Sequence, residues 1–521
     1  MKHVPASPVE AQFYLSGQLH PTPAVNTVTK AVGIRGPLQS ERLVRALRHV
    51  SLRHAALRTR FQAVDGAIAR ILADEAPQQP IEIREAPGTD AALADAAEAA
   101  RRDLSPQSTV WKALLLRHGP DDHTFIFSAH RSVWDERSMD LFAAEVSQLY
   151  HADPADSGPS RASAIDAAPL YSGDAYEDLV VEGARHLAAG LADVPALHGF
   201  PLKTTRPRIL SVDAASVEIA FEHATTRLLS EVGRPWGLDP FTLQSTAAAY
   251  VLAQYCGQQK LAIGMPFCLR PAHSEQVLLG SHTAMLPLGF AAAAPTFAAL
   301  ASSFAASYSA ARPFAAIPFH AVVKQCAART DPSANPLFQI ACVEDRHLLL
   351  QFDGCDCRSR AVPVPPQHVD LFLQFAPDTL RLAYATEIIH DEMAASLGRS
   401  ISAFLTAALR EPQRDLSSLP VLAERERAAL VIDVNRTDEP SFLNQDLYSI
   451  ATRHCNPANH QNALVCNGRS LSYADLLRAV ESVAARLSEA GVAEQDLVGI
   501  CLPRSSDMVA AMLAVLRCGN A

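Results

Sequence analysis

Apolar and polar positions along the first 150 residues alternate between two periods. Residues 41–53 place apolar side chains at the spacing of one helical face, which predicts a helix. Residues 111–117 and 123–130 are strand-like apolar runs separated by a Gly-Pro-Asp-Asp turn signal. Helical spacing resumes over 135–150. A strand-to-helix junction is therefore expected at residues 131–134.

The remainder of the chain continues this mixed pattern. Residues 151–175 are rich in Ala, Ser, Pro and Asp and predict a loop, and the polar residues 431–445 predict a linker. Further strands are expected at 261–266, 337–343 and 371–375, and a last helix at 391–409. The expected parts are residues 1–175, 176–430, the linker 431–445, and a third unit at 446–521.

Composition narrows the range of functions. The 521 residues carry 45 Lys and Arg against 55 Asp and Glu, a net charge of −10, which argues against a nucleic-acid partner. The sequence contains no uninterrupted apolar run of about 18 residues and no signal-peptide pattern, so we expect a cytoplasmic protein without a membrane partner. The ten cysteines lack metal-ligand spacing, and no metal site is expected.

A series of short motifs along the first 425 residues gives the fold a more specific interpretation. The motifs are SPVEAQFYL (7–15), RHAALRTRF (53–61), HRSVWDE (130–136), YEDL (176–179), TRPR (205–208), IGMPFCLR (263–270), LG (279–280) and NPLFQ (335–339). In this order the series resembles the condensation domains of nonribosomal peptide synthetases. The resemblance implies an α/β fold of two chloramphenicol-acetyltransferase-like subdomains in a V shape, with the active site in a tunnel between them.

Two later motifs resemble the start of an adenylation domain. They are LSYADL (471–476) and LAVLRCGNA (513–521). The resemblance implies a partial α/β adenylation subdomain that lacks the phosphate-gripping loop, so this chain is not expected to make an aminoacyl-adenylate. The remainder of an adenylation domain is an expected partner. Peptidyl carrier proteins are expected to deliver donor and acceptor on phosphopantetheine arms, and the chain itself is expected to bind no cofactor.

The motif at 130–136 departs from the family pattern HHxxxDG at the position that matters most for catalysis. In the family, the second histidine orients the attacking amine or accepts its proton. Arg131 stands there in this chain, and a guanidinium has five donors, no acceptor, and a pKa too high for a base. Glu136 replaces the family glycine. It is interpreted either as an ion-pair partner of Arg131 that closes the site or as a solvated acid on the first turn of a helix.

The other positions of the motif are conventional. The resemblance implies that Asp135 pairs with Arg270 and tethers the two subdomains. His130 matches the first histidine and is either a hydrogen-bonded positioning residue or a satisfied core residue. The predicted catalytic-site residues are therefore His130, Arg131, Asp135 and Glu136.

Several further residues are candidates for the lining of the tunnel. Arg58 and His282 belong to matching motifs, and Ala284 stands where the family segment has Asn. His282 is weighed as a substitute base, as are His54 and His320. Their spacing supports no metal site.

Three functions follow from the altered motif. The first is a platform, impaired in amide formation, that docks a trans-acting cytochrome P450 or iron-dependent hydroxylase, because the His-Arg change resembles X-domains and interface domains. The second is an atypical condensation domain that still forms an amide or ester between carrier-bound donor and acceptor. The third is a vestigial domain that holds the adenylation domain.

Overall fold

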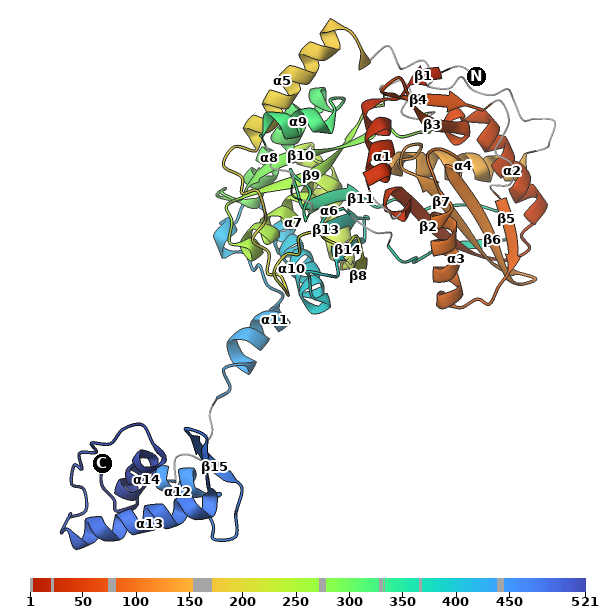
Figure 1. Cartoon of the computed structure of the whole chain (residues 1–521). Helices are drawn as coiled ribbons and strands as arrows, with labels where there is room; N and C mark the ends of the chain where they lie inside the picture. The colour runs from red at the N-terminus through yellow and green to blue at the C-terminus, as the bar shows by residue number, and fades with distance from the viewer. Residues whose placement is uncertain are drawn as a thin grey trace. The chain divides into compact units, whose positions relative to one another are not determined.

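The computed structural model describes residues 3–19, 23–73, 81–152, 171–270, 278–327, 331, 333–364, 368–437 and 445–521 (Figure 1). The chain divides into two compact units, residues 1–427 and 428–521. The predicted loop 151–175 and linker 431–445 lie partly outside the described residues, at 153–170 and 438–444.

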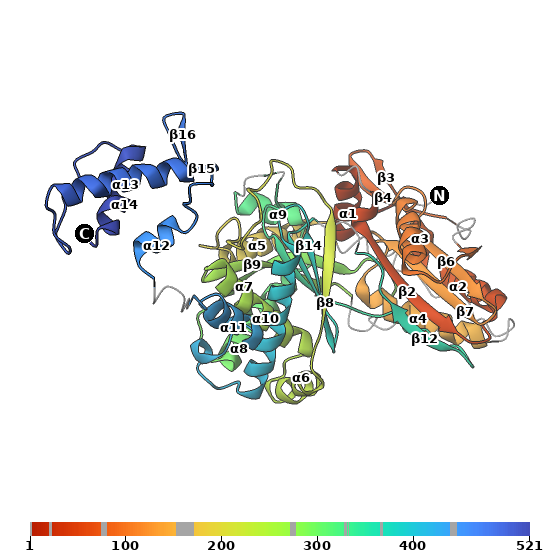
Figure 2. The same cartoon turned by 90° about the horizontal axis from the view of Figure 1, so that it is seen from below.

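The first half of unit 1 has three layers. Its helices are α1 (Pro8–Leu19), α2 (Ser40–Arg53), α3 (Asp90–Arg102) and α4 (Glu136–His151), with 3-10 turns at Pro23–Asn26 and Ala55–Arg58. Its strands are β1 (His3–Pro5), β2 (Thr27–Arg35), β3 (Thr59–Val64), β4 (Ala67–Leu72), β5 (Ile81–Glu85), β6 (Trp111–Gly119) and β7 (Asp122–His130). A five-stranded sheet in the order β12-β2-β7-β6-β5 includes β12 (Asp356–Arg360) from later in the chain. α2 and α4 pack on one face of this sheet and α3 on the other (Figure 2).

The elements predicted in this half are confirmed. The helix over 41–53 is α2, the two strands are β6 and β7, and the following helix is α4. α4 begins one residue later than the apolar spacing suggests. Asp135 has extended backbone and caps the helix, because its carboxylate accepts a hydrogen bond from the Ser138 N–H.

The second half of unit 1 is built on a six-stranded sheet. Its strands are β8 (Ala214–Ala220), β9 (Lys260–Cys268), β10 (Thr283–Ala291), β11 (Ile340–Glu344), β13 (Leu371–Phe375) and β14 (Thr379–Ala385), in the order β10-β9-β11-β13-β14-β8. Its helices are α5 (Asp174–Gly190), α6 (His223–Trp236), α7 (Pro240–Cys256), α8 (Phe297–Ala311), α9 (Phe319–Gln325) and α10 (Asp391–Arg410). One continuous apolar core joins this sheet to its helices.

One strand boundary in this half differs from the prediction. The strand expected at 337–343 begins only at Ile340, as β11. The Asn335 side chain accepts hydrogen bonds from the N–H groups of Leu337 and Phe338, at 3.1 and 3.3 Å. These two residues therefore belong to a turn closed by Asn335, and their apolar side chains are buried without joining the ladder.

β12 connects the two halves of unit 1. It belongs in sequence to the second half but pairs antiparallel with β2 of the first half, from Asp356 opposite Arg35 to Arg360 opposite Ala31. Figure 2 shows this teal strand beside the red and orange strands of the first half. The predicted α/β class is confirmed. The two halves are joined by β12, which crosses from the second half into the sheet of the first, and by side-chain contacts.

Unit 2 is a smaller α/β body. It contains α12 (Leu447–Thr452), β15 (Asn462–Cys466), β16 (Arg469–Ser472), α13 (Tyr473–Glu489) and α14 (Ser506–Arg517), and α11 (Glu424–Ala428) precedes it with a π-turn at Ala429–Asp433. Its core lies mainly between α13 and α14. Across both units, none of the helices in the described ranges is long and apolar enough to cross a membrane.

Candidate functional site

The HRSVWDE segment spans the last residue of β7, a short turn and the first residue of α4. Val133 N–H donates to His130 O at 3.0 Å, and Arg131 N–H donates to Asn26 O at 2.7 Å, so the strand ends in a turn. Trp134 anchors this turn in the core, with its ring 4.6 Å from that of Phe127 between centroids. An aromatic pair of this kind adds about 1 kcal/mol beyond its buried area. The turn that carries the motif is therefore held by backbone hydrogen bonds and by packing of Trp134 in the core.

Asp135 is the centre of a buried network between the two halves of unit 1. Its carboxylate accepts from both terminal nitrogens of Arg270, at 2.6 and 2.7 Å, and the Arg270 side chain is fully buried. The His282 N–H and the Thr283 hydroxyl also donate to it, each at 3.1 Å. Burial raises the pKa of Asp135, but the hydrogen bonds and charge of Arg270 outweigh burial and leave this pKa lowered. Asp135 is thus ionised, and both of its carboxylate oxygens already accept hydrogen bonds from neighbouring groups.

His130 is buried and held in one tautomer. Its Nδ1 accepts a hydrogen bond from the Ser132 N–H at 3.2 Å and lies 2.8 Å from the Ser132 hydroxyl. The ring proton therefore resides on Nε2. Burial, together with the positive charge of Arg131, lowers the pKa of His130 to about 3. At neutral pH this imidazole is an uncharged donor, and its acceptor nitrogen is already occupied.

Arg131 and Glu136 face each other without forming a tight pair. Arg131 Nη2 lies 3.9 Å from Glu136 Oε1, beyond hydrogen-bond distance. Glu136 Oε2 is buried and has no hydrogen-bond partner within the described residues. The Glu136 side chain is only 16% exposed, which does not fit the interpretation of Glu136 as a solvated acid. Burial raises the pKa of Glu136 in spite of the nearby Lys30 and Arg131 charges.

The raised pKa of Glu136 predicts a pH-dependent cost in stability. A carboxyl whose pKa is higher in the folded state destabilises the fold as pH rises from its unfolded pKa, about 4.3, through its folded pKa. The substitution Glu136→Gln removes this cost. In urea unfolding, the free energy of unfolding of the variant should therefore exceed that of the wild type by more at pH 8 than at pH 5. If the free energies of unfolding of variant and wild type differ by the same amount at both pH values, the Glu136 carboxylate does not destabilise the fold.

The sequence prediction missed a second charged pair beside this site. Lys30 of β2 forms an ion pair with Asp345, just after β11, and both side chains are largely buried. Burial raises the pKa of Asp345, but Lys30 outweighs burial and leaves this pKa lowered. The available signal was a lysine inside the apolar strand TVTKAVGIR. Nothing in the sequence indicated its partner.

The other predicted residues lie around the network or apart from it. His282 joins it through its backbone, and burial together with Arg270 lowers the pKa of its ring to about 4. Ala284 is buried in the core of the second half. Arg58 donates to the carbonyls of Ala73 and Leu52, at 2.7 and 3.2 Å. His54 pairs with Glu145, and His320 is exposed on α9.

No group of three or more potential metal ligands occurs among the residues that the structure describes. At the site, His130 Nε2 and the Arg131 guanidinium are hydrogen-bond donors, and Glu136 Oε2 has no hydrogen-bond partner among the described residues.

Comparison with known families matches nearly the whole chain. The condensation-domain family matches residues 1–431, and the AMP-binding-enzyme family matches residues 452–521. Tyrocidine synthase 3 of Brevibacillus parabrevis is 24% identical over 99% of this chain and 8% of its own length. Phosphinothricin tripeptide synthetase PhsC of Streptomyces viridochromogenes is 25% identical over 99% of this chain and 49% of its own length. The chain thus spans less than half of either relative.

Solved structures show the same fold. The X-domain in complex with OxyB from teicoplanin biosynthesis is 23% identical, with a TM-score of 0.67 over 81% of this chain and 97% of that chain. The four-domain nonribosomal peptide synthetase holo-AB3403, bound to AMP and glycine, is 18% identical, with a TM-score of 0.79 over 100% of this chain and 41% of that chain. At these identities the likeness establishes architecture alone.

Proposed function

The chain belongs to the condensation-domain family of nonribosomal peptide synthetases, and we propose that it receives carrier-bound thioesters but is impaired in joining them. The observation that carries the proposal is the lack of a basic nitrogen in the motif. His130 is neutral with its acceptor nitrogen occupied, and Arg131 cannot accept a proton. An amine bound here would meet donors where amide formation needs an acceptor.

A docking role follows from the parts of the site that are retained. Asp135 and Arg270 act as the tether between subdomains 1–175 and 176–430, so the scaffold keeps its form while its chemistry is reduced. The X-domain of teicoplanin biosynthesis has the same fold and forms a complex with OxyB. By analogy this chain presents a carrier-bound substrate to a cytochrome P450 or an iron-dependent hydroxylase. Phosphopantetheine arms come from the partner carrier proteins.

One observation favours a second function, an atypical but active condensation domain. Glu136 has a buried carboxylate oxygen without a hydrogen-bond partner among the described residues and a raised pKa, and its other oxygen lies 3.9 Å from Arg131 Nη2. A carboxylate of this kind accepts a proton more readily than an ordinary one. In this alternative Glu136 takes the proton of the attacking amine, and Arg131 stabilises the oxyanion. The intermediate then collapses with cleavage of the thioester C–S bond, the donor carrier's phosphopantetheine leaves as a thiol that takes up the proton, and the product is an amide, or an ester from a hydroxyl acceptor.

A single-turnover assay separates the two functions. Donor and acceptor carriers are loaded, mixed with the chain, and the product is followed by mass spectrometry. For the platform we expect slow product formation that Glu136→Gln leaves unchanged. For the atypical enzyme we expect Glu136→Gln to slow product formation about 100-fold or more, the usual loss for a proton-transfer residue.

A binding measurement completes the test. The platform requires that a candidate P450 or hydroxylase bind the chain in the presence of a loaded carrier, as followed by fluorescence anisotropy. Fast wild-type turnover that depends on Glu136, together with no such binding, would overturn the platform in favour of the enzyme.

A further inference from the structure

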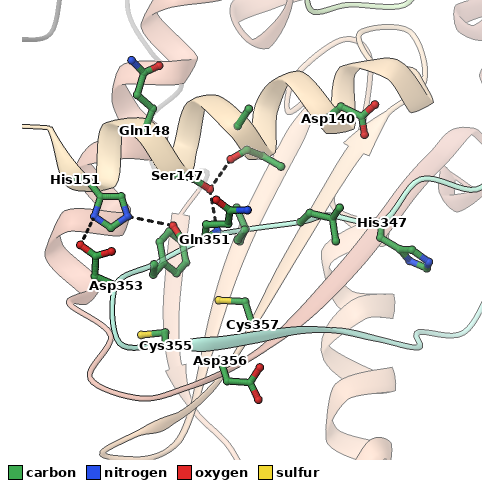
Figure 3. Close-up of a pocket in the computed structure, with 15 residues that line it drawn as sticks. Asp140, Ser147, Gln148, His151, His347, Gln351, Asp353, Cys355, Asp356 and Cys357 are labelled. Atoms are coloured by element: carbon green, nitrogen blue, oxygen red, sulfur yellow. Dashed lines mark hydrogen bonds and ion pairs between the residues drawn. The ribbon is translucent and has the colours of Figure 1, made fainter.

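The chain passes from the second half of unit 1 to the first half directly after β11. β11 ends at Glu344, and the Asp345 N–H still donates to Phe375 O of the same sheet at 2.8 Å. Leu348 already belongs to the core of the first half. Figure 3 shows the segment that follows running below α4, with His347 at the same end as Asp140. The backbone of Asp345 is therefore held by the second half, at the point where the chain leaves it.

Two ion pairs join this crossing point to the first half. Lys30 of β2 pairs with Asp345, and the two side chains are only 12% and 5% exposed. The next residue, Arg346, pairs with Asp140 of α4. When one partner of a buried pair is withdrawn, the other charge stays desolvated, which is costly. A displacement of Asp345 would therefore leave Lys30 in need of another acceptor.

Lys30 lies on the face of its sheet that α4 covers. Successive residues of a strand point to opposite faces, so Lys30 shares its face with Val28 and Val32. These two valines belong to the core of the first half, together with Met139 in the first turn of α4. The Lys30 side chain therefore leaves β2 toward the beginning of α4.

Glu136 begins α4 and lies on the side of this helix that faces the crossing point. Glu136 and Asp140 are four residues apart in α4, so they share one face of it. Asp140 contacts Arg346, so this face is directed toward residues 345–346. Burial raises the pKa of Glu136, and the Lys30 charge opposes burial more strongly than Arg131 does. Glu136 is thus a second acid close to the Lys30 charge.

The two acids differ in what they bind. Asp345 accepts from Lys30. Glu136 Oε2 is buried and has no hydrogen-bond partner in the part of the chain that the structure describes, and Arg131 Nη2 lies 3.9 Å from Oε1. A buried acceptor without a partner is costly, so a donor that becomes available nearby is bound.

We propose that Lys30 is a partner that Asp345 and Glu136 share, and that a displacement of Asp345 transfers Lys30 to Glu136. Lys30 and Glu136 both belong to the first half, whereas the backbone of Asp345 is bound to the second. After the transfer, Glu136 is an ion-paired carboxylate and a poorer proton acceptor. The arrangement of the two halves thereby sets the charge state at the motif. This holds for the platform and for the atypical enzyme, because it concerns the charge of Glu136 and not the reaction.

The substitution Asp345→Asn tests whether the lysine is shared. It removes the present partner of Lys30, and we expect Glu136 to replace that partner. In the wild type, Glu136→Gln should increase the free energy of unfolding more at pH 8 than at pH 5. In the Asp345→Asn background this pH-dependent gain should disappear, because a carboxylate paired with Lys30 no longer has a raised pKa and costs no stability as pH rises. The same gain in both backgrounds, measured by urea unfolding, would overturn the proposal.

Two variants control this measurement. Asp140→Asn makes the same exchange at the neighbouring ion pair, leaves Lys30 on Asp345, and should keep the wild-type gain. Asp345→Glu provides Lys30 with another acid and should restore the gain. If Asp140→Asn abolishes the gain as well, the effect comes from loosening of the halves and not from Lys30.

Other charged groups lie beside the two acids. They are Arg381 and His347 at Asp345, and Arg131 and Asp135 at Glu136. They are present in both members of each comparison, so their own titration cancels.

A double-variant cycle at pH 8 gives an independent readout. Asp345→Asn should raise the equilibrium constant of unfolding about 10-fold more in the Glu136→Gln background than in the wild type, because Lys30 then has neither acid. Strictly additive effects would show that Lys30 is not shared. An Asp345→Asn chain that fails to fold, while Asp345→Glu folds, would show that Glu136 does not replace Asp345 and would also contradict the proposal.

Discussion

Replacing Asp135 with asparagine is expected to lower the free energy of unfolding of unit 1 by about 4 kcal/mol. The variant keeps an acceptor for the α4 cap but leaves the fully buried Arg270 guanidinium without a counter-charge. Removing one partner of a buried pair typically costs about 3–5 kcal/mol, because the other charge stays desolvated. Urea unfolding followed by tryptophan fluorescence reports unit 1 alone, since Trp111, Trp134 and Trp236 all lie in it.

The matched control is an exposed ion pair. Lys260 and Asp193 lie 3.3 Å apart with 44% and 86% of their side chains exposed, so Asp193→Asn should cost less than about 1 kcal/mol. The double variant Asp135→Asn/Arg270→Met should recover part of the loss, because it removes the unpaired charge as well. An Asp135→Asn variant as stable as the Asp193→Asn control would show that the pair does not hold the two halves together.

Restoring the histidine is expected to have the largest effect on activity. Arg131→His places an imidazole at the motif's second position and removes the charge that contributes to lowering the pKa of His130. Proton transfer by a positioned base contributes about 10²- to 10⁴-fold to rate, so single-turnover amide formation should rise by at least 100-fold. The assay uses loaded donor and acceptor carriers and detects the product by mass spectrometry.

Two variants control this experiment. Arg48→His makes the same exchange on an exposed position of α2 and should leave the rate unchanged. Arg131→His/Glu136→Gly restores both positions of the family motif, and a further gain would show that Glu136 contributes to the block. If wild type and Arg131→His form product equally fast, Arg131 is not the cause of impairment, and the atypical enzyme becomes the better description.

The sequence by itself determined the local architecture around the motif. The strand β7, the helix α4 and the junction between them follow from periodicity and turn residues, which act over a few positions. The replacement of a base by Arg131 is likewise visible in the sequence, since a guanidinium cannot accept a proton in any fold. The condensation-domain resemblance indicated Asp135 and Arg270, which the structure brings together.

Only the tertiary structure decided the electrostatic state of the site. Burial and a backbone N–H make His130 a neutral donor, and a 3.9 Å separation leaves Glu136 short of a tight pair with Arg131. Lys30 and Asp345, 315 positions apart, meet because the chain crosses between the two halves of unit 1. Such effects depend on which groups lose water and which charges remain within a few ångströms, and neither is encoded in local spacing.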